Sequence, residues 1–256
     1  MNLRFNTHLA DSYKSNVQKA RVLSEDWIAK NMFCPICGNP TLSHYKANKP
    51  VADFYCNHCH SDYELKSKRN KYGTLGTRIT DGAYETMINR ISSFNNPNFF
   101  FLSYNADSVI NVLLIPNHFF TTDIIEQRKP LSQTARRAGW IGCNINIASI
   151  PDSGKIFIVR NGVEIDKQYV LENYKKVKSL QTKNLDNRGW LMDILTCIDE
   201  IQSNEFSLRQ VYEFVDILKQ KHPTNNNIEA KIRQQLQFLR DRNFIEFTER
   251  GKYRKL

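Results

Sequence analysis

Three absences limit the class of protein to which this sequence of 256 residues belongs. It contains no run of about 18 apolar residues, so we expect no membrane-spanning helix and no membrane partner. Its first fifteen residues lack the apolar stretch of a secretory signal, so we expect a cytoplasmic protein whose cysteines are reduced. It also has no internal repeat and no long tract rich in glycine, serine or proline. What remains is an ordinary globular composition, with 41% hydrophobic and 24% charged residues.

The charge balance gives the first positive indication of a partner. Lysine and arginine number 36 against 26 aspartates and glutamates, so the formal net charge is +10. Such an excess favours a polyanionic partner, because cations that neutralise phosphates release condensed counterions. Charge alone also fits a basic soluble protein that binds no nucleic acid, so the motifs have to decide.

Hydrophobic periodicity predicts a mixed region of helices and strands up to about residue 181. Two continuous apolar runs, at 98–104 and 109–115, are typical of strands buried on both faces. Apolar residues at three-to-four-residue spacing predict a helix at 79–92, capped by Thr80 or Asp81. The other predicted elements are a helix at 18–30, strands at 50–56 and 61–67, and a strand at 155–160 that enters a turn at Asn161-Gly162. We therefore predict an α/β (α+β) domain over residues 1–181.

The sequence after residue 182 has an almost wholly helical pattern until its last dozen residues. It predicts a helix at 190–202, a second that begins at a capping box formed by Ser207 and Gln210, and a third at 228–241. Two short runs follow, at 244–247 and 252–255, and Arg250-Gly251 joins them. Three helices and a terminal hairpin predict a winged-helix domain over residues 182–256, a variant of the helix–turn–helix.

Four cysteines have the spacing of a structural zinc site. Cys34 and Cys37 form one C-x-x-C pair, Cys56 and Cys59 form another, and 18 residues separate the pairs. Each pair places two thiolates on one tight turn, and two such turns complete a tetrahedral shell. Because four protein ligands leave no open position, we expect a structural zinc and not a catalytic one.

Other readings of the cysteines remain open from the spacing alone. The pairs also fit redox-active dithiols, or cysteines that lie near one another by accident. His58 or His60 offers an alternative ligand, although four thiols already fill the shell. Cys143 and Cys197 are isolated in the sequence, and we expect both to be ordinary buried residues.

Two carboxylates and a lysine follow the same segment of the chain. Asp53 precedes the Cys56 turn, and Glu64 and Lys66 lie two apart on the next predicted strand, so they face the same side. If the two strands pair through the turn, Asp53 reaches that side too. Such a set can hydrolyse a phosphodiester: Asp53 and Glu64 with the Leu65 carbonyl would hold Mg²⁺, and Lys66 would assist the attacking water. The spacing alone also fits a solvated charged strand.

Basic and aromatic residues predict the contacts with DNA. The third C-terminal helix presents one polar face, and Arg and Gln side chains read base edges in the major groove. The alternative for each residue is a solvated surface position, or for Trp140 a place in the core. The candidates are Lys231, Arg233, Gln234, Gln237 and Arg240 on the helix, Lys252 and Arg254 on the wing, Arg136, Arg137 and Trp140 in the first domain, and Arg188 near a helix N-terminus.

Several of these segments together resemble the DpnI family of methyl-directed Type II restriction endonucleases. The resemblance covers essentially the whole chain and rests on the segments 50–58, 64–66, 96–101, 136–144, 188–190 and 250–256. It implies a PD-(D/E)xK nuclease core with a zinc-ribbon-like insertion that carries the four cysteines, and a C-terminal winged helix. By position it makes Asp53 and Glu64 metal ligands and Lys66 the catalytic lysine. Ala52 stands where the general nuclease pattern has proline, at a position that does no chemistry.

The resemblance also implies a substrate, namely double-stranded DNA cut at GATC sites in which adenine carries an N6-methyl group. We expect the enzyme to act as a monomer with catalytic Mg²⁺ and structural Zn²⁺, and we take Trp140 as the hypothetical sensor of the methyl group. Two alternatives remain. One is a DNA-binding regulator without catalytic activity, which would need no set such as Asp53, Glu64 and Lys66. The other is a nuclease of different sequence specificity.

Overall fold

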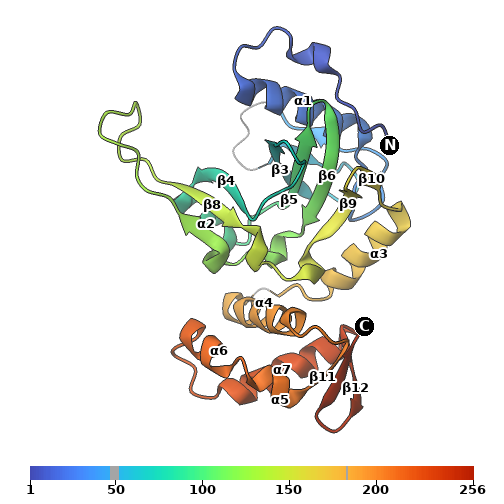
Figure 1. The fold of residues 1–256 in the computed structure, drawn as a ribbon, viewed down its shortest axis with the longest axis vertical. Helices are drawn as coiled ribbons and strands as arrows, with labels where there is room; N and C mark the ends of the chain where they lie inside the picture. The colour runs from blue at the N-terminus through green and yellow to red at the C-terminus, as the bar shows by residue number, and fades with distance from the viewer. Residues whose placement is uncertain (47–51, 183) are drawn as a thin grey trace.

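The computed structural model describes residues 1–46, 52–182 and 184–256 and consists of two stacked parts (Figure 1). The larger part contains the N-terminal sheets, and the smaller part contains the C-terminal helices and their own small sheet (Figure 1). The first residues of the strand predicted at 50–56 lie outside the described residues. Within the described ranges, no helix is both long enough and apolar enough to cross a bilayer.

A seven-stranded sheet forms the centre of the larger part. Its strands, in spatial order, are β1 (Ser43–His44), β2 (Phe54–Tyr55), β3 (Asp62–Arg69), β5 (Asn98–Asn105), β6 (Ser108–Ile115), β9 (Ile156–Arg160) and β10 (Val163–Glu164). Only β3 and β5 pair in parallel; the other neighbours are antiparallel. β5 and β6 are buried along nearly their whole length, which confirms two apolar strands covered on both faces. Asn161 and Gly162 turn the chain from β9 into β10 with positive φ angles of 52° and 76°.

A second, three-stranded sheet lies beside the first and corrects one prediction. Its order is β4 (Arg78–Ala83), β8 (Gly142–Asn146) and β7 (Ile125–Gln127), and α2 (Tyr84–Ser92) packs against all three strands. The prediction of a helix at 79–92 is therefore wrong over its first five residues, and neither Thr80 nor Asp81 caps α2. Ile79 pairs with Ile145 on β8 and is buried there, so tertiary pairing overrides the helical periodicity.

Helices cover the larger sheet, and one long loop leaves the body. α1 (Asn16–Asn31) packs against β3 and corresponds to the helix predicted at 18–30, whereas α3 (Lys167–Lys178), against β9, was not predicted. Residues 128–141, between β7 and β8, form a protruding loop that we call the arm (Figure 1). Single-turn 3-10 helices complete this part: η1 (Thr7–Ala10), η2 (Asn117–Phe119), η3 (Thr122–Ile124), η4 (Ile147–Ser149) and η5 (Asp152–Gly154).

The smaller part is a helix–turn–helix unit with a three-stranded sheet. Its helices are α4 (Leu185–Glu200), α5 (Leu208–Tyr212), α6 (Val215–Lys221) and α7 (Ile228–Arg240). The sheet has the order β11 (Glu205–Ser207), β13 (Lys252–Lys255) and β12 (Ile245–Glu249). The predicted capping box is present, with Ser207 and Gln210 bonding each other's backbone at the start of α5. The second predicted helix is broken into α5 and α6, and the short strand β11 was not predicted.

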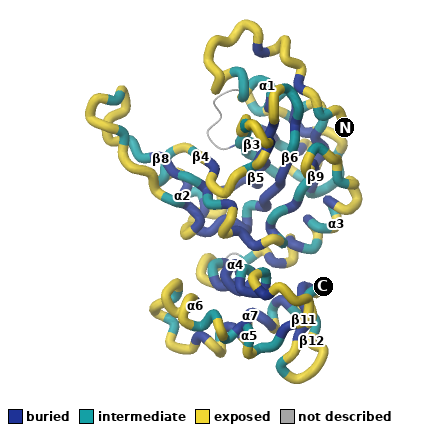
Figure 2. The backbone as a smooth tube through the Cα atoms, in the orientation of Figure 1, coloured by how far each residue is buried: buried dark blue, intermediate teal, exposed yellow. Residues whose placement is uncertain are grey.

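α4 joins the two parts of the molecule. It packs against η2 and η5 on one side and α7 on the other, and most of it after its exposed first three residues is buried (Figure 2). Trp190, Ile194 and Ile198 are at most 4% exposed, as the apolar stripe predicted. The helix therefore acts as a shared core element and joins the C-terminal part to the larger part.

Candidate active site and metal centre

The four cysteines of the two C-x-x-C pairs meet at one point next to the start of β3. Their sulfur atoms all lie within 4.8 Å of one another, and Cys34–Cys59 and Cys37–Cys56 are each 3.6 Å apart. A zinc–sulfur bond of about 2.3 Å puts tetrahedral sulfurs about 3.8 Å apart, so the donor set fits zinc. Gly38 follows the first pair with a φ of +78°, a conformation that suits glycine and lets its N–H bond to the Cys34 carbonyl.

The alternative ligands lie outside this thiol cluster. Among the described residues, the group able to hold a metal contains the four cysteines and neither His58 nor His60, which are exposed. Cys143 and Cys197 are buried elsewhere, as expected.

Tyr63 contacts the thiol cluster and precedes Glu64 on β3. Its hydroxyl lies 3.1 Å from the Cys34 sulfur, and its ring stacks on Phe100 inside the core. Burial and the neighbouring Cys34 raise the pKa of Tyr63 far above its usual range, so the hydroxyl stays protonated and can donate to a thiolate. Because successive side chains of a strand point to opposite faces, Tyr63 faces the cysteines and Glu64 faces away from them.

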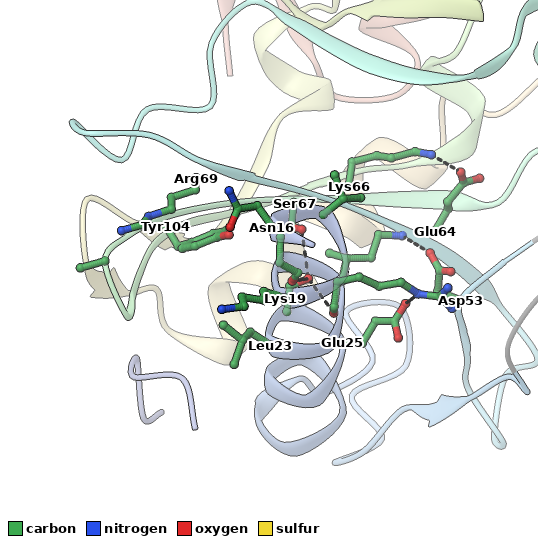
Figure 3. Close-up of a pocket in the computed structure, with 16 residues that line it drawn as sticks. Asn16, Lys19, Leu23, Glu25, Asp53, Glu64, Lys66, Ser67, Arg69 and Tyr104 are labelled. Atoms are coloured by element: carbon green, nitrogen blue, oxygen red, sulfur yellow. Dashed lines mark hydrogen bonds and ion pairs between the residues drawn. The ribbon is translucent and has the colours of Figure 1, made fainter. Parts of the chain in front are cut away.

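Asp53 lines a cleft of about 670 Å³ between α1 and β3 (Figure 3). Its Oδ2 accepts a hydrogen bond of 2.7 Å from the Leu65 N–H, and its own N–H donates to the Tyr63 carbonyl at 2.9 Å. The strand pairing that continues from β2 and β3 therefore holds Asp53 beside Glu64, which lines the same cleft.

The structure brings Glu64 and Lys66 into direct contact. The Lys66 ammonium lies 2.6 Å from Glu64 Oε1 (Figure 3), and it also pairs with Asp81. Arg90 binds the other oxygen of Glu64 at 2.7 Å. The predicted trio of Asp53, Glu64 and Lys66 is thus assembled at one cleft, with two further charged residues behind it.

Asp81 and Arg90 are residues that the sequence reasoning did not select for the site. Asp81 comes from β4 and Arg90 from α2, both in the excursion of the chain between β3 and β5. Nothing in their spacing from Glu64 marks them, because only the fold of the second sheet places them there. The sequence predicts Asp81 only as a candidate helix cap.

Glu25 is a further carboxylate that the sequence reasoning did not select. It projects from α1 into the cleft, where Arg21 binds it at 2.6 Å and His44 at 3.3 Å. Burial raises the pKa of Asp53, and the charge of Glu25 adds to that, whereas the Leu65 N–H, Lys66 and Arg21 oppose it.

Lys66 remains charged in this setting. Its burial disfavours the ammonium, but the charges of Glu64 and Asp81 outweigh burial and raise the pKa of Lys66. The site therefore combines carboxylate oxygens, which are the ligands that hard divalent cations prefer, with a fixed positive charge that can stabilise an anion.

The arm carries the predicted cation–aromatic group. Arg136 and Arg137 are exposed, and the Arg137 guanidinium lies 4.6 Å from the centre of the Trp140 ring. Trp140 packs over Gly142, where a Cβ would come within 2.8 Å of the ring. The arm includes four cations, with Arg128 and Lys129 at its base, and no acidic residue.

The polar face of α7 is open to solvent as predicted. Arg233, Gln234 and Gln237 are exposed and follow one another at helical spacing, while Lys231 bonds Asn187 and Arg240 packs over Phe247. On the wing the predicted phosphate-binding cations are already paired within the structure. Lys252 pairs with Glu249, and Arg254 bridges Glu205 and Glu246 with two contacts of 2.8 Å.

Arg188 is the one predicted DNA contact that the structure places in the interior. Only 5% of it is exposed, and its guanidinium donates to the carbonyls of Phe120 and Thr182. It also lies 4.8 Å from the Phe94 ring. The prediction that Arg188 meets a phosphate is therefore wrong: it ties α4 to the larger part, and burial lowers its pKa.

Comparison with protein families covers the chain from end to end. The DpnI model, described as the Dam-replacing family, matches residues 1–183. The DpnI_C model, described as the Dam-replacing HTH domain, matches residues 186–255, which include all but the first residue of α4, the helices α5 to α7 and the small sheet. The first match alone spans more than half of the chain. The protein therefore belongs to the DpnI, or Dam-replacing, family of methyl-directed restriction endonucleases.

Proposed function

We propose that the chain is a Type II endonuclease that hydrolyses double-stranded DNA at GATC sites containing N6-methyladenine, with Mg²⁺ as its cofactor. The observation that carries the proposal is the meeting of Asp53, Glu64 and Lys66 at one cleft. A DNA-binding regulator needs no such set, whereas a PD-(D/E)xK nuclease is defined by it. The family match and the helix–turn–helix part support the same conclusion.

The residues of the cleft have different roles in the proposed reaction. Asp53 and Glu64, with the Leu65 carbonyl, would hold Mg²⁺, which when bound polarises the phosphate and lowers the pKa of its water. Lys66 orients the attacking water and stabilises charge that develops on the phosphate. Its buried position strengthens that interaction, because little solvent screens the ammonium.

The thiol cluster supports the cleft without taking part in the reaction. Four thiolates complete a tetrahedral shell, so a bound Zn²⁺ has no open position for substrate. Its two turns fix the start of β3 and the segment that carries Asp53. We therefore assign zinc a structural role.

In this proposal, both parts of the molecule contact the DNA. Residues 1–181 form the nuclease domain, and the winged helix of residues 182–256 places α7 in the major groove. There the exposed Gln234 and Gln237 would meet base edges, together with Arg233, which in this structure bonds the Tyr212 hydroxyl. The arm adds backbone contacts from Arg136 and Arg137.

Selectivity for the methyl group needs more than one contact. Burying one methyl is worth about 0.8 kcal/mol, which is roughly a fourfold preference. Reading both methylated strands, or reading the site with both domains, multiplies that preference. Trp140 is our candidate for one of these readers, because it stands beside Arg137 on the exposed arm. If Trp140→Ala cleaves methylated and unmethylated DNA as the wild type does, this role is excluded.

One digest tests the proposed function. A plasmid with adenine-methylated GATC sites and the same plasmid without methylation are incubated with the protein, with Mg²⁺ or with a chelator. We expect fragments only from the methylated plasmid and only with Mg²⁺. Retarded but intact DNA would favour a regulator, and equal cutting of both plasmids would remove the methyl requirement. In vitro methylation of the resistant plasmid is the matched control and should restore cutting.

A further inference from the structure

A row of four alternating charges runs behind the cleft. Arg90 contacts Glu64 at 2.7 Å, Glu64 contacts Lys66 at 2.6 Å, and Lys66 contacts Asp81. The row thus begins with a cation at the proposed metal ligand and ends with a carboxylate at the catalytic lysine. Both outer residues come from the excursion between β3 and β5 and not from the strands that carry the site.

These charges are shielded from water. The exposed fraction of the side chain is 5% for Asp81, 13% for Glu64, 15% for Arg90 and 20% for Lys66. Opposite charges at such distances interact several times more strongly there than in bulk water. Removing one charge from the row therefore changes the electrostatic energy of the neighbouring charges.

Asp81 directs its charge at Lys66. Its Oδ1 accepts from the Lys66 ammonium and from the Gly82 N–H at 2.6 Å. Its Oδ2 is buried and has no hydrogen-bond partner among the described residues. Lys66 is therefore shared between Asp81 and Glu64, and the charge of Asp81 offsets part of the positive charge that Lys66 places beside Glu64.

Arg90 acts on Glu64 in the opposite sense. A divalent cation that approaches Glu64 meets two positive charges already bound to that carboxylate, one from Lys66 and one from Arg90. Asp81 offsets the first of them through its contact with Lys66, and the second adds its positive charge directly at Glu64. The two outer residues should therefore change the affinity for a cation in opposite directions.

We propose that Asp81 and Arg90 are positioning residues that set the metal affinity of the cleft in opposite directions. Asp81 raises the affinity because its negative charge offsets that of Lys66 beside Glu64, and Arg90 lowers it by competing with the cation for Glu64. The proposal rests on the proposed function, because it assumes that Asp53 and Glu64 hold the metal.

The test titrates DNA-free, zinc-loaded protein with Ca²⁺ in a calorimeter. Ca²⁺ suits the purpose because carboxylates bind it and thiolates do not. We expect Asp81→Asn to weaken Ca²⁺ binding about tenfold, which corresponds to about 1.4 kcal/mol, and Arg90→Gln to tighten it severalfold. Asp81→Glu keeps the charge and should restore binding to within about threefold of the wild type.

Two surface variants provide matched controls. Glu85→Gln removes one negative charge from α2, and Arg78→Gln removes one positive charge from β4, where Arg78 pairs with Glu126 instead of the cleft. Both should bind Ca²⁺ as the wild type does. If they shift the affinity as much as the buried variants do, net charge and not position is responsible, and the proposal fails.

The signs of the two effects decide the remaining outcomes. Weaker binding by both Asp81→Asn and Arg90→Gln, with lower melting temperatures, would show that the residues only support the fold and would overturn the proposal. Unchanged binding by both would overturn it as well. Should Asp81→Asn fail to fold, Arg90→Gln decides alone, because misfolding does not tighten binding. If the wild type binds no Ca²⁺ and cuts no DNA, the proposed function itself fails. If the wild type does both and the variants bind Ca²⁺ with unchanged affinity, only this inference fails.

Discussion

The thiol cluster, which Tyr63 contacts, and the carboxylate of Glu64 lie on opposite sides of the same strand, β3, and the two sites differ in how they are held. The four sulfurs already lie within 4.8 Å of one another, close to the separation that zinc requires. The carboxylates of the cleft are instead bound by cations of the protein itself, Lys66 and Arg90 at Glu64. The arrangement of the thiols suits an ion that stays bound, whereas the carboxylates keep counterions that an incoming ion would have to displace.

This difference follows from what each site has to do. A structural ion contributes its binding free energy to folding, so a closed shell of four thiolates is favourable. A catalytic ion needs open positions for water and phosphate, so the protein cannot surround it. The buried carboxylates then need partners in the metal-free state, because an unpaired buried charge is strongly destabilising.

Asp53→Asn should have the largest effect, and on the cleft alone. We expect cleavage of methylated plasmid to fall at least about a thousandfold, or about 4 kcal/mol, because a proposed metal ligand is lost. Binding of the same DNA should stay within a few-fold, and the zinc content should not change. Asp62→Asn is the matched control, since Asp62 bonds the Tyr45 hydroxyl outside the cleft. Substantial cutting by Asp53→Asn would remove Asp53 from the reaction.

Zinc removal should instead act on stability first. We expect chelation, or Cys56→Ser, to lower the free energy of unfolding by at least about 3 kcal/mol, and the melting temperature by roughly 6–12 °C. Cleavage should fall only as the region that carries Asp53 loses its structure. Scanning calorimetry with metal analysis measures both. Cys197→Ala, which removes a buried thiol outside the cluster, controls for packing. A metal-free protein with full stability would contradict the assigned role.

The two sites also differ in how far the sequence could predict them. All four thiols lie within two short turns, so their spacing alone indicated the cluster that the structure contains. Asp53, Glu64 and Lys66 could be selected because a hairpin converts sequence spacing into proximity. Asp81, Arg90 and Glu25 could not, because they reach the cleft from β4, α2 and α1 through tertiary packing.

The same limit applies to the fold. Elements with strong local patterns were predicted well, such as the buried pair β5 and β6 and the capping box at Ser207. Elements decided by pairing with distant strands were not. β4 has a helical periodicity but pairs with β8, and the three-residue β11 exists only because β13 lies beside it. Arg188 was misplaced for the same reason, since only the packing of α4 buries its charge.

A buried histidine allows the acid sensitivity of the thiol cluster to be separated from that of the rest of the fold. His118 donates from Nε2 to the Val177 carbonyl at 2.9 Å, and burial lowers the pKa of His118 to about 4. Since the unfolded chain binds a proton near pH 6.5 and the folded chain does not, stability is fully present above pH 6.5. It is lost as the pH falls from 6.5 to about 4, by about 3 kcal/mol in total.

His118→Gln tests this assignment, because it removes the titrating group and keeps a donor for Val177. Urea unfolding at several pH values should give a flatter profile for the variant between pH 6.5 and 4, with thiolate protonation as the remaining acid-sensitive step. Equal slopes for variant and wild type would assign the whole loss to other groups.

Tyr63→Phe makes the smallest change and asks whether the two sites are independent. The variant loses the hydroxyl that lies 3.1 Å from Cys34, and it keeps the ring stacked on Phe100. A hydrogen bond to a charged acceptor contributes about 1.5–3 kcal/mol, so we expect a loss of about 2 kcal/mol in unfolding experiments. Cleavage should stay within about twofold, since Glu64 faces the other side of β3 and keeps its contacts with Lys66 and Arg90. A larger loss of cleavage at unchanged zinc content would mean that the thiol cluster affects the reaction at the cleft through β3. The closed structural site and the exchangeable site would then not be independent.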